Sequence, residues 1–291
     1  MAEAKVAAEG GAKAPVVALV RGLSQSFERS LRQEEPEEAI DVAKAEEQHK
    51  RYVALLRELV EEVIEVEADE ECPDCNFIED TAFMVGELAI ACRPGAMSRR
   101  NEVAPVLEIL RSLPEVASVA EVADPGTVDG GDVLAMRRHV FIGLSSRSNE
   151  AAVEQTRAAV LAHYGSERAP AVVAIAVPSG LHLKSAISYF DAGTILYADT
   201  AGGREVAKTI AELDASYTLV PVPHPVVANI LRVGRHVVVQ EGICSASTAL
   251  LQEMCTAAGL RMHQLCMSEL VKADGALTCG SILVQRGERN E

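Results

Sequence analysis

The sequence predicts a single α/β domain, built as a closed ring of five similar units with pseudo-fivefold symmetry. The first observation is a near-constant interval between chemically active side chains. Asp80, Asp129, His182 and Cys279 are separated by 49, 53 and 97 residues, and Asn229 divides the last interval into two. A repeat of this length is typical of radial arrays, in which each supersecondary unit presents an equivalent position to a shared centre.

The second observation is an apolar pattern that returns after each of these positions. Pairs of short apolar runs indicate hairpins, because brief turns such as VG and RR separate the two runs of a pair. The pairs are TAFMVG/ELAIACR, DVLAMRR/HVFIGLS, SAISYF/GTILYAD, NILRV/RHVVVQ and TCG/SILVQR. The first four are followed by helix-like segments, at about 102–112, 149–163, 203–213 and 245–258. A doubly wound sheet would fit the same alternation, but the sequence has no glycine-rich phosphate loop of the Rossmann or P-loop kind.

The two ends of the chain complete the ring. The last pair of runs lacks a following helix, whereas the N-terminal part offers a strand (PVVALVRGL), a helix over 41–59 with Asp41 as N-cap, and a second strand (VIEVE). We therefore expect the N-terminal strand and helix to supply the missing part. The small and polar residues 1–15 are expected to form a disordered leader, which leaves residues 16–291 as one catalytic domain. The charged segment 26–39, interrupted by Pro36, predicts a mobile loop.

The composition narrows the classes of partner. A formal net charge of −16 argues against binding to a phosphate backbone and fits attraction of a cationic small molecule. The absence of Trp and the scarcity of aromatic residues (3%) make stacking on single-stranded nucleic acid improbable. No apolar stretch reaches the roughly 20 residues that span a bilayer. Seven irregularly spaced cysteines do not resemble a secreted disulfide framework, so a cytoplasmic location is expected.

The repeat brings together groups that suit covalent hydrolysis. A thiol, an imidazole and two carboxylates around one axis would form a nucleophilic site for a cationic substrate. Taken singly, each residue has a plainer interpretation: Cys279 as a small core residue, His182 as a packed histidine, Asp129 as part of a hairpin turn. The adjacent acids Glu79 and Asp80 are harder to explain structurally, because carboxylates are rarely buried unpaired within an apolar run.

A family resemblance is carried by several motifs in order. They are DCNFIEDTAF, RPGAMSRR, VDGGDVL, GLSSRSN, GLHLKS and SEL…DGALTC. Their order and spacing resemble those of the dimethylarginine dimethylaminohydrolases, members of the guanidine-modifying (pentein) superfamily, over nearly the whole chain after about Val16. The resemblance implies a five-bladed β/α propeller with its active site on the central axis.

The resemblance also implies a role for each site residue. Cys279 is expected to be the nucleophile, His182 the general acid/base and Asp129 the carboxylate that completes the set. Expected substrate-binding residues are Leu31, Asp74, Glu79, Asp80, Arg99, Arg147 and Asp274, with Asp80 on the guanidinium and the two arginines on the α-carboxylate. No cofactor or catalytic metal is implied, although zinc could occupy Cys279 and His182 as an inhibitor.

The expected activity is hydrolysis of Nω-methylated arginines, asymmetric dimethylarginine and monomethylarginine, to citrulline plus dimethylamine or methylamine. The expected intermediate is a covalent cysteine thiouronium. Two alternatives stay open at this point: an arginine or agmatine deiminase, and a catalytically weak regulatory protein on the same scaffold. The expected partner is the small-molecule substrate, with neither nucleic acid nor membrane, and the protein is expected to be a monomer or a homodimer.

Overall fold

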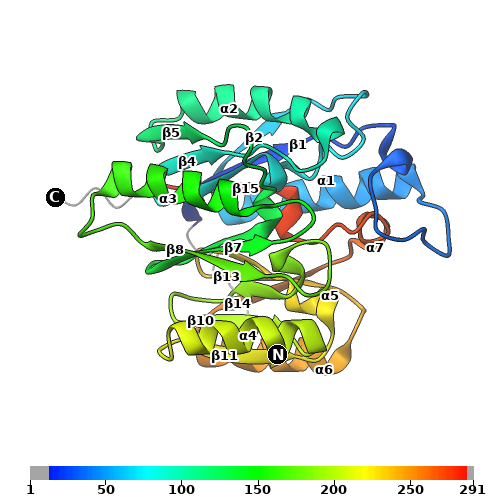
Figure 1. Cartoon of the computed structure of the whole chain (residues 1–291). Helices are drawn as coiled ribbons and strands as arrows, with labels where there is room; N and C mark the ends of the chain where they lie inside the picture. Colours follow the sequence, from blue (N-terminus) through cyan, green and yellow to red (C-terminus); the bar gives the residue numbers. More distant parts are fainter. Residues whose placement is uncertain (1–12, 287–291) are drawn as a thin grey trace, which may run out of the picture.

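The strands form five three-stranded sheets in the computed structural model, which describes residues 13–286. In each sheet an antiparallel pair of strands is extended by a third, parallel strand, and a helix connects the pair to that strand. In Figure 1 the helices α2, α3, α4 and α6 lie at the outside of the molecule and cover the strands. The predicted ring of five similar α/β units is confirmed.

Four of the units follow one another along the chain. The first contains β3 (Ala82–Val85), β4 (Leu88–Ala91), α2 (Val103–Ser112) and β5 (Ser118–Glu121). The second contains β6 (Val133–Ala135), β7 (His139–Leu144), α3 (Glu150–Tyr164) and β8 (Ala171–Ala176). The third contains β9 (Ile187–Tyr189), β10 (Thr194–Ala198), α4 (Ala201–Leu213) and β11 (Thr218–Val222). The fourth contains β12 (Leu231–Val233), β13 (His236–Gln240), α6 (Ser245–Ala257) and β14 (Arg261–Leu265).

The fifth unit is assembled from both ends of the chain. It contains β1 (Ala14–Arg21), α1 (Val42–Leu59), β2 (Val60–Val66) and β15 (Ile282–Gln285). β15 pairs antiparallel with β1, where Val284 is opposite Val17, and β1 pairs parallel with β2. Asp41 caps α1 as predicted, because its side chain accepts a hydrogen bond from the Lys44 amide. The two termini of the described chain are thereby fixed in one sheet.

Two details of the predicted units are wrong. TCG is not the hairpin partner of SILVQR, because Thr278–Gly280 forms a 3₁₀ turn (η6) and β15 pairs with β1 instead. The prediction also omitted the third strand of the first four units. β5 and β14 have short or mixed sequences, SVAE and RMHQL, which lack the continuous apolar pattern by which buried strands are recognised. β8, in contrast, is the continuous apolar run AVVAIA, and the prediction missed it although its sequence carries that signal.

Five apolar clusters close the ring. Each cluster joins one unit to the next, and one of them packs Val16 and Leu56 of the fifth unit against Val233 and Val238 of the fourth. The remaining clusters join the fifth unit to the first, the first to the second, the second to the third and the third to the fourth. Because these contacts form a complete cycle, the units surround a common axis.

The N-terminal segments differ from their predictions in part. Residues 1–12 of the predicted leader lie outside the described residues, and β1 already begins at Ala14. The predicted mobile loop over 26–39 contains a short 3₁₀ helix, η1 (Phe27–Arg29). Phe27 is fully buried with its ring 5.8 Å from that of Phe77, so the first half of this segment is fixed by packing.

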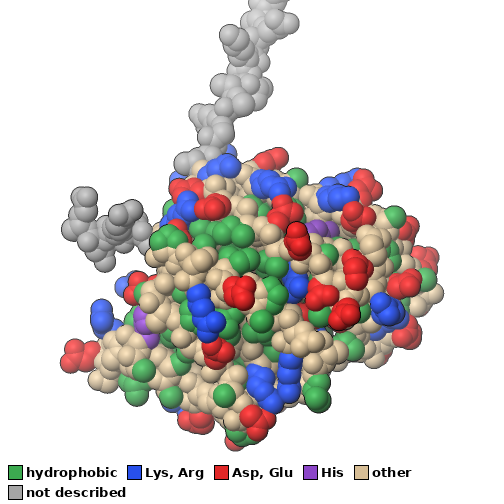
Figure 2. Space-filling model, turned by 90° about the horizontal axis from the view of Figure 1, so that it is seen from above, with side chains coloured by type: hydrophobic (Ala, Val, Ile, Leu, Met, Phe, Trp, Pro, Cys, Tyr) green, Lys and Arg blue, Asp and Glu red, His purple; other side chains and the backbone are tan. Residues whose placement is uncertain are grey.

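The surface of the molecule carries charged side chains of both signs (Figure 2). Figure 2 shows acidic and basic side chains intermingled over one face of the molecule, with apolar patches between them. None of the helices within residues 13–286 is long and apolar enough to cross a membrane.

Candidate active site

Short helical turns bring the widely spaced residues of the repeat together. Each inner strand of the ring is preceded by one: η2 (Ile78–Thr81), η4 (Gly130–Asp132), η5 (Leu183–Ser185), α5 (Pro225–Ala228) and η6 (Thr278–Gly280). Asp80 lies in η2 and Cys279 in η6, whereas Asp129 and His182 are the N-cap residues that directly precede η4 and η5. The turn η2 contacts both η4 and η6, and η4 contacts η5. The predicted convergence is therefore present in the fold.

One narrow cavity receives most of the predicted residues. Its empty volume, part of which is open to solvent, is about 330 Å³. Eight of the ten predicted site residues line it: Leu31, Asp74, Asp80, Arg99, Arg147, His182, Asp274 and Cys279. Asp129 is fully buried directly behind His182, and Glu79 lies elsewhere.

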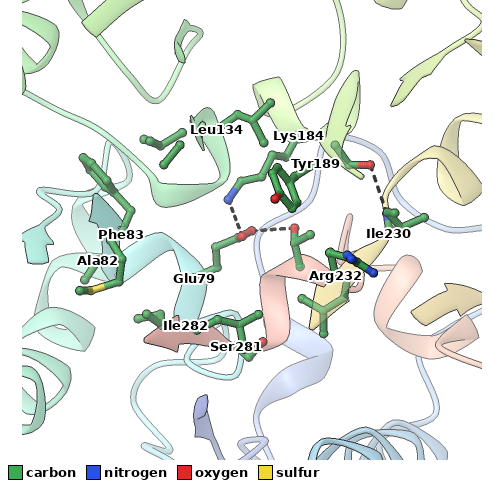
Figure 3. Close-up of a pocket in the computed structure, with 17 residues that line it drawn as sticks. Glu79, Ala82, Phe83, Leu134, Lys184, Tyr189, Ile230, Arg232, Ser281 and Ile282 are labelled. Carbon is green, nitrogen blue, oxygen red and sulfur yellow. Dashed lines mark hydrogen bonds and ion pairs between the residues drawn. The ribbon is translucent and has the colours of Figure 1, made fainter. Parts of the chain in front are cut away.

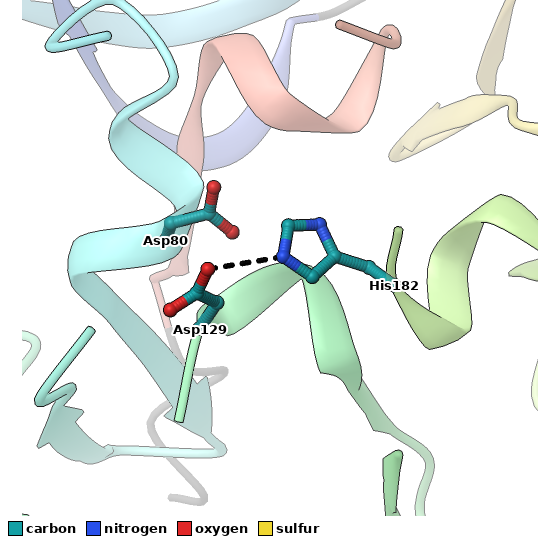
Figure 4. A group of neighbouring side chains, drawn as sticks. All are labelled: Asp80, Asp129 and His182. Atoms are coloured by element: carbon teal, nitrogen blue, oxygen red, sulfur yellow. Dashed lines mark hydrogen bonds and ion pairs between the residues drawn. The ribbon is translucent and has the colours of Figure 1, made fainter. Parts of the chain in front are cut away.

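His182 is held by Asp129. The Nε2 atom of His182 lies 3.0 Å from Oδ2 of Asp129 (Figure 4). The other carboxylate oxygen of Asp129 accepts a hydrogen bond from the Gly95 amide at 2.9 Å, and the Ser148 hydroxyl accepts one from the Asp129 amide. The carboxylate is therefore fixed on both oxygens, and it fixes the orientation of the imidazole.

Asp80 faces His182 from the neighbouring turn. Its two oxygens accept hydrogen bonds from the Gly131 amide at 2.8 Å and from Nη1 of Arg99 at 2.5 Å. Burial by itself would raise the pKa of Asp80, but the charges of His182 and Arg99 lower it to about 2. Asp80 is therefore an anion at every pH at which the protein would work.

The pKa values of the His182 imidazole and the Cys279 thiol are both raised, so that one group is charged and the other neutral. Burial disfavours a charged His182, but Asp80, the bond to Asp129 and the charge of Asp132 raise the pKa of His182 to about 9. Burial raises the pKa of the Cys279 thiol, and the charges of Glu79 and Asp80 raise it further. Near neutral pH the site thus holds an imidazolium and a protonated thiol.

Two adjacent glycines permit this close arrangement. A Cβ atom at Gly131 would lie 2.6 Å from Nδ1 of His182 and 2.9 Å from Oδ1 of Asp80. A Cβ atom at Gly130 would lie 1.9 Å from the Glu79 carbonyl oxygen. The GG pair of VDGGDVL, which the sequence suggested as a turn, therefore lets η2 and η4 approach each other.

The two predicted arginines differ in availability. Arg99 is 4% exposed, and its guanidinium binds Asp80, Glu102 and the carbonyl oxygens of Asp74 and Phe77. Arg147 is more accessible and makes one longer ion pair, 3.6 Å from Asp129. The structure therefore leaves Arg147 as the arginine that can receive an anionic group in the cavity.

The rim of the cavity is formed by the segment around Leu31. Asp74 accepts a hydrogen bond from the Leu31 amide at 3.0 Å, and Asp274 accepts one from the Gln33 amide at 2.6 Å. Asp274 has a φ of 57°, a conformation that non-glycine residues rarely adopt. These bonds hold residues 31–33 over the cavity, where the resemblance placed Leu31, Asp74 and Asp274.

The Glu79 side chain lies outside the cavity that contains Cys279, and its role in substrate binding stays a prediction. Its carboxylate binds the Lys184 ammonium and, at 2.9 Å, the Thr278 hydroxyl. These three residues line a second cavity along the axis, shown in Figure 3, rather than the cavity that contains Cys279. The physical reason is that Asp80 follows Glu79 within one helical turn, so the two side chains point to different sides.

Several residues of the site were not predicted. Glu102 neutralises Arg99, and four further residues complete the wall of the cavity: Phe77, Leu181, Ala273 and Gly275. All four are close in sequence to a predicted residue, and three of them, Phe77, Leu181 and Gly275, lie within the quoted motifs DCNFIEDTAF, GLHLKS and DGALTC. Their apolar character gave no separate signal, because apolar residues in such positions are usually core residues.

The group of side chains that could hold a metal ion differs from the predicted zinc ligands, Cys279 and His182. Among the described residues, Asp80, Asp129 and His182 offer ligand atoms within 4.8 Å of one another, and Cys279 is not part of this group. The residues fit zinc poorly, because His182 is protonated near neutral pH and Asp80 is paired with Arg99. The expected inhibitory zinc stays a prediction.

Known proteins that resemble the chain are enzymes that modify guanidine groups. A family model described as arginine deiminase matches residues 70–218. An N(G),N(G)-dimethylarginine dimethylaminohydrolase of Streptomyces coelicolor is 33% identical, over 91% of this chain and 95% of that protein.

Two solved structures also resemble the chain. One is a dimethylarginine dimethylaminohydrolase adduct with S-methyl-L-thiocitrulline, with a TM-score of 0.79 and 26% identity over 92% of this chain and 98% of that one. A Pseudomonas aeruginosa DDAH mutant complexed with citrulline has a TM-score of 0.77 and 25% identity, over 92% of this chain and 98% of that one. With its five-unit ring and the cavity around Cys279, the chain belongs to the dimethylarginine dimethylaminohydrolase family of the pentein superfamily.

Proposed function

We propose that the protein hydrolyses Nω-methylated arginines to citrulline and dimethylamine or methylamine, through a covalent intermediate on Cys279. The observation that carries the proposal is the single cavity that holds Cys279, His182 and Asp80, with Arg147 also in its wall. The similar structures with citrulline and S-methyl-L-thiocitrulline support this substrate class. Seven free cysteines support a reducing, cytoplasmic setting.

Substrate binding follows from the charges of the cavity. A methylated guanidinium is a planar cation, and Asp80 is the ionised carboxylate that faces His182 beneath the rim. Each carboxylate oxygen has more than one lone pair, so Asp80 can bind the substrate while it keeps its bonds to Arg99 and Gly131. Paired N–H bonds to Asp80 hold the plane of the guanidinium and present its central carbon to the Cys279 sulfur.

The substrate itself assists formation of the thiolate. In the free protein the Cys279 thiol is protonated, because burial and the charges of Glu79 and Asp80 raise its pKa. A guanidinium bound beside the sulfur adds a positive charge in a poorly solvated site, which favours release of the thiol proton to water and formation of the thiolate. The sulfur then attacks the central carbon and forms a tetrahedral adduct.

His182 carries the protons. It is charged near neutral pH, so it can donate a proton to the departing amine while the C–N bond breaks. The products of this step are the amine and a thiouronium on Cys279. Neutral His182 then accepts a proton from water, whose oxygen bonds to the same carbon. The C–S bond breaks while the proton of the added hydroxyl passes to the sulfur, so citrulline is released and the Cys279 thiol is restored.

Arg147 is proposed to bind the α-carboxylate of the substrate. For Arg147→Ala we expect KM for dimethylarginine to rise roughly 10- to 100-fold, because a hydrogen bond to a charged group contributes about 1.5–3 kcal/mol. Steady-state kinetics would measure it. Arg138→Ala, which removes an exposed arginine outside the site, is the matched control. An unchanged KM would show that Arg147 does not hold the carboxylate.

A panel of substrates distinguishes the proposed function from its alternative. The match to the arginine deiminase model favours, as a second candidate, a deiminase that acts on unmethylated arginine. We expect citrulline from asymmetric dimethylarginine and monomethylarginine, and much slower product formation from arginine and agmatine. Colorimetric detection of the ureido product in parallel reactions would measure this. Faster turnover of arginine would favour the deiminase, and no product from any substrate would favour a regulatory protein.

A further inference from the structure

A closed circuit of side chains lies directly behind the catalytic cavity. The Lys184 ammonium and the Thr278 hydroxyl both donate to the Glu79 carboxylate, the hydroxyl at 2.9 Å. The Asn229 amide group donates to the Thr278 hydroxyl at 3.2 Å and to the Lys184 carbonyl oxygen at 3.1 Å. The Thr278 backbone amide donates to the Asn229 side-chain oxygen at 3.1 Å. We call these four residues, Glu79, Lys184, Asn229 and Thr278, the axial network.

Three members of the axial network, Glu79, Lys184 and Thr278, are close neighbours of the reacting groups along the chain. Glu79 precedes Asp80, and Thr278 precedes Cys279. Lys184 follows His182 by two residues, within the turn that His182 directly precedes. A shift of the backbone at one member would therefore move the adjacent reacting side chain. The network links the turns that carry the thiol, the imidazole and the guanidinium-binding carboxylate.

The axial network does not contact the proposed substrate. Glu79, Lys184 and Thr278 line the axial cavity in Figure 3, which is bounded mainly by the inner strands of the ring. None of the four residues is among the described residues that line the cavity of Cys279. Glu79 is 8% exposed and Asn229 is 4% exposed, so their bonds are sheltered from water. A role in catalysis would therefore act through the neighbouring residues.

Both carboxylate oxygens of Glu79 accept a hydrogen bond, one from Lys184 and one from Thr278, so the orientation of the carboxylate is well defined. Burial raises the pKa of Glu79, and this is opposed by the charge and the hydrogen bond of Lys184. A buried ion pair is a weak source of stability, since apolar residues of similar volume often stabilise a fold equally well. Its directional bonds, in contrast, allow few alternative arrangements of the turns that it joins.

We propose that Glu79, Lys184, Asn229 and Thr278 are positioning residues, which set the location of the Cys279 sulfur relative to His182 and the bound guanidinium. This inference rests on the proposed function, and it gives Glu79 a role different from that of a substrate ligand. Thr278 is the central member, because it bonds to both Glu79 and Asn229 and is covalently joined to Cys279.

The test is Thr278→Val, which keeps the shape of the side chain and removes the hydroxyl. We expect kcat for dimethylarginine to fall on the order of 10²-fold, the effect typical of a misplacement of about 1 Å. KM should stay nearly unchanged, because the substrate contacts are retained. Thr278→Ser, which keeps the hydroxyl, should restore most of the lost rate. Asn229→Leu, which is remote in sequence from every reacting residue, should lower kcat in the same way.

The matched control is Thr156→Val. Thr156 is fully buried on α3, and its hydroxyl has no hydrogen-bond partner among the described residues. The same chemical change is thus made at a buried threonine outside the axial network, and kcat should be unaltered. Rates are compared below the unfolding temperature of each variant, so that loss of folded protein does not contribute.

A second measurement separates this inference from the proposed function. Alkylation of Cys279 by 2-chloroacetamidine, a small planar cation, is followed by mass spectrometry and does not depend on the true substrate. Slower alkylation in Thr278→Val and wild-type rates in Thr278→Ser would support the axial network, even if methylated arginines were not hydrolysed. Wild-type kcat and alkylation in Thr278→Val and Asn229→Leu would overturn the inference, even if dimethylarginine were the substrate. A loss of rate that Thr278→Ser failed to restore would also overturn it.

Discussion

Cys279→Ser is expected to lower kcat for dimethylarginine on the order of 10⁴- to 10⁶-fold, the range seen when a catalytic nucleophile is removed. A serine hydroxyl is far harder to deprotonate than a thiol, and the cationic substrate beside it does not compensate for that difference. Release of citrulline under saturating substrate would measure the loss. Substrate binding should persist, because Asp80 and Arg147 are unchanged.

A second cysteine provides the control for this change. Cys255 is fully buried on α6, away from the cavity, so Cys255→Ser should keep wild-type turnover. Rapid acid quenching of the wild-type protein during turnover should yield Cys279 with the added mass of the thiouronium, and the serine variant should lack it. Retention of wild-type turnover by Cys279→Ser would exclude covalent catalysis by this residue.

His182→Ala is expected to lower kcat by about 10²- to 10⁴-fold, the usual contribution of general acid/base catalysis. The wild-type protein needs the charged imidazole for departure of the amine, and its pKa is raised to about 9. Wild-type turnover should therefore decline as the pH rises through about 9. The variant should lack this decline. A pH–rate profile of both proteins would measure the difference.

The same substitution has a consequence for stability. The pKa of His182 is higher in the folded protein, about 9, than its usual value of 6.5, so the charged form stabilises the fold. This stabilisation is complete below pH 6.5 and is lost as the pH rises through 9. It amounts to about 3 kcal/mol. Denaturant unfolding should thus show that the free energies of unfolding of the wild type and of His182→Ala approach each other as the pH rises from 6.5 to 9. A difference that stayed constant over this range would contradict the raised pKa. His163→Ala, a histidine outside the site, is the matched control.

The sequence alone predicted the ring and most of the residues that line the cavity of Cys279. The regular spacing of Asp80, Asp129, His182 and Cys279 predicted five units around an axis, since a repeat in the chain is retained as a repeat in space. The hairpins and helices followed from apolar periodicity, and the site residues from motifs that resemble a family. Eight of the ten predicted residues share one cavity because each belongs to a turn or loop at the same end of the ring.

The tertiary structure decided how the charged groups are paired. Arg99 binds Asp80 and Glu102, and Glu79 faces Lys184 in a different cavity from its neighbour Asp80. The pairing of β1 with β15 likewise joins residues at opposite ends of the chain. Sequence patterns report periodicity along the chain, whereas the partner of a buried charge is set by groups that approach from distant segments. For that physical reason the partners of these charges, and the axial network behind Cys279, became visible only in the folded chain.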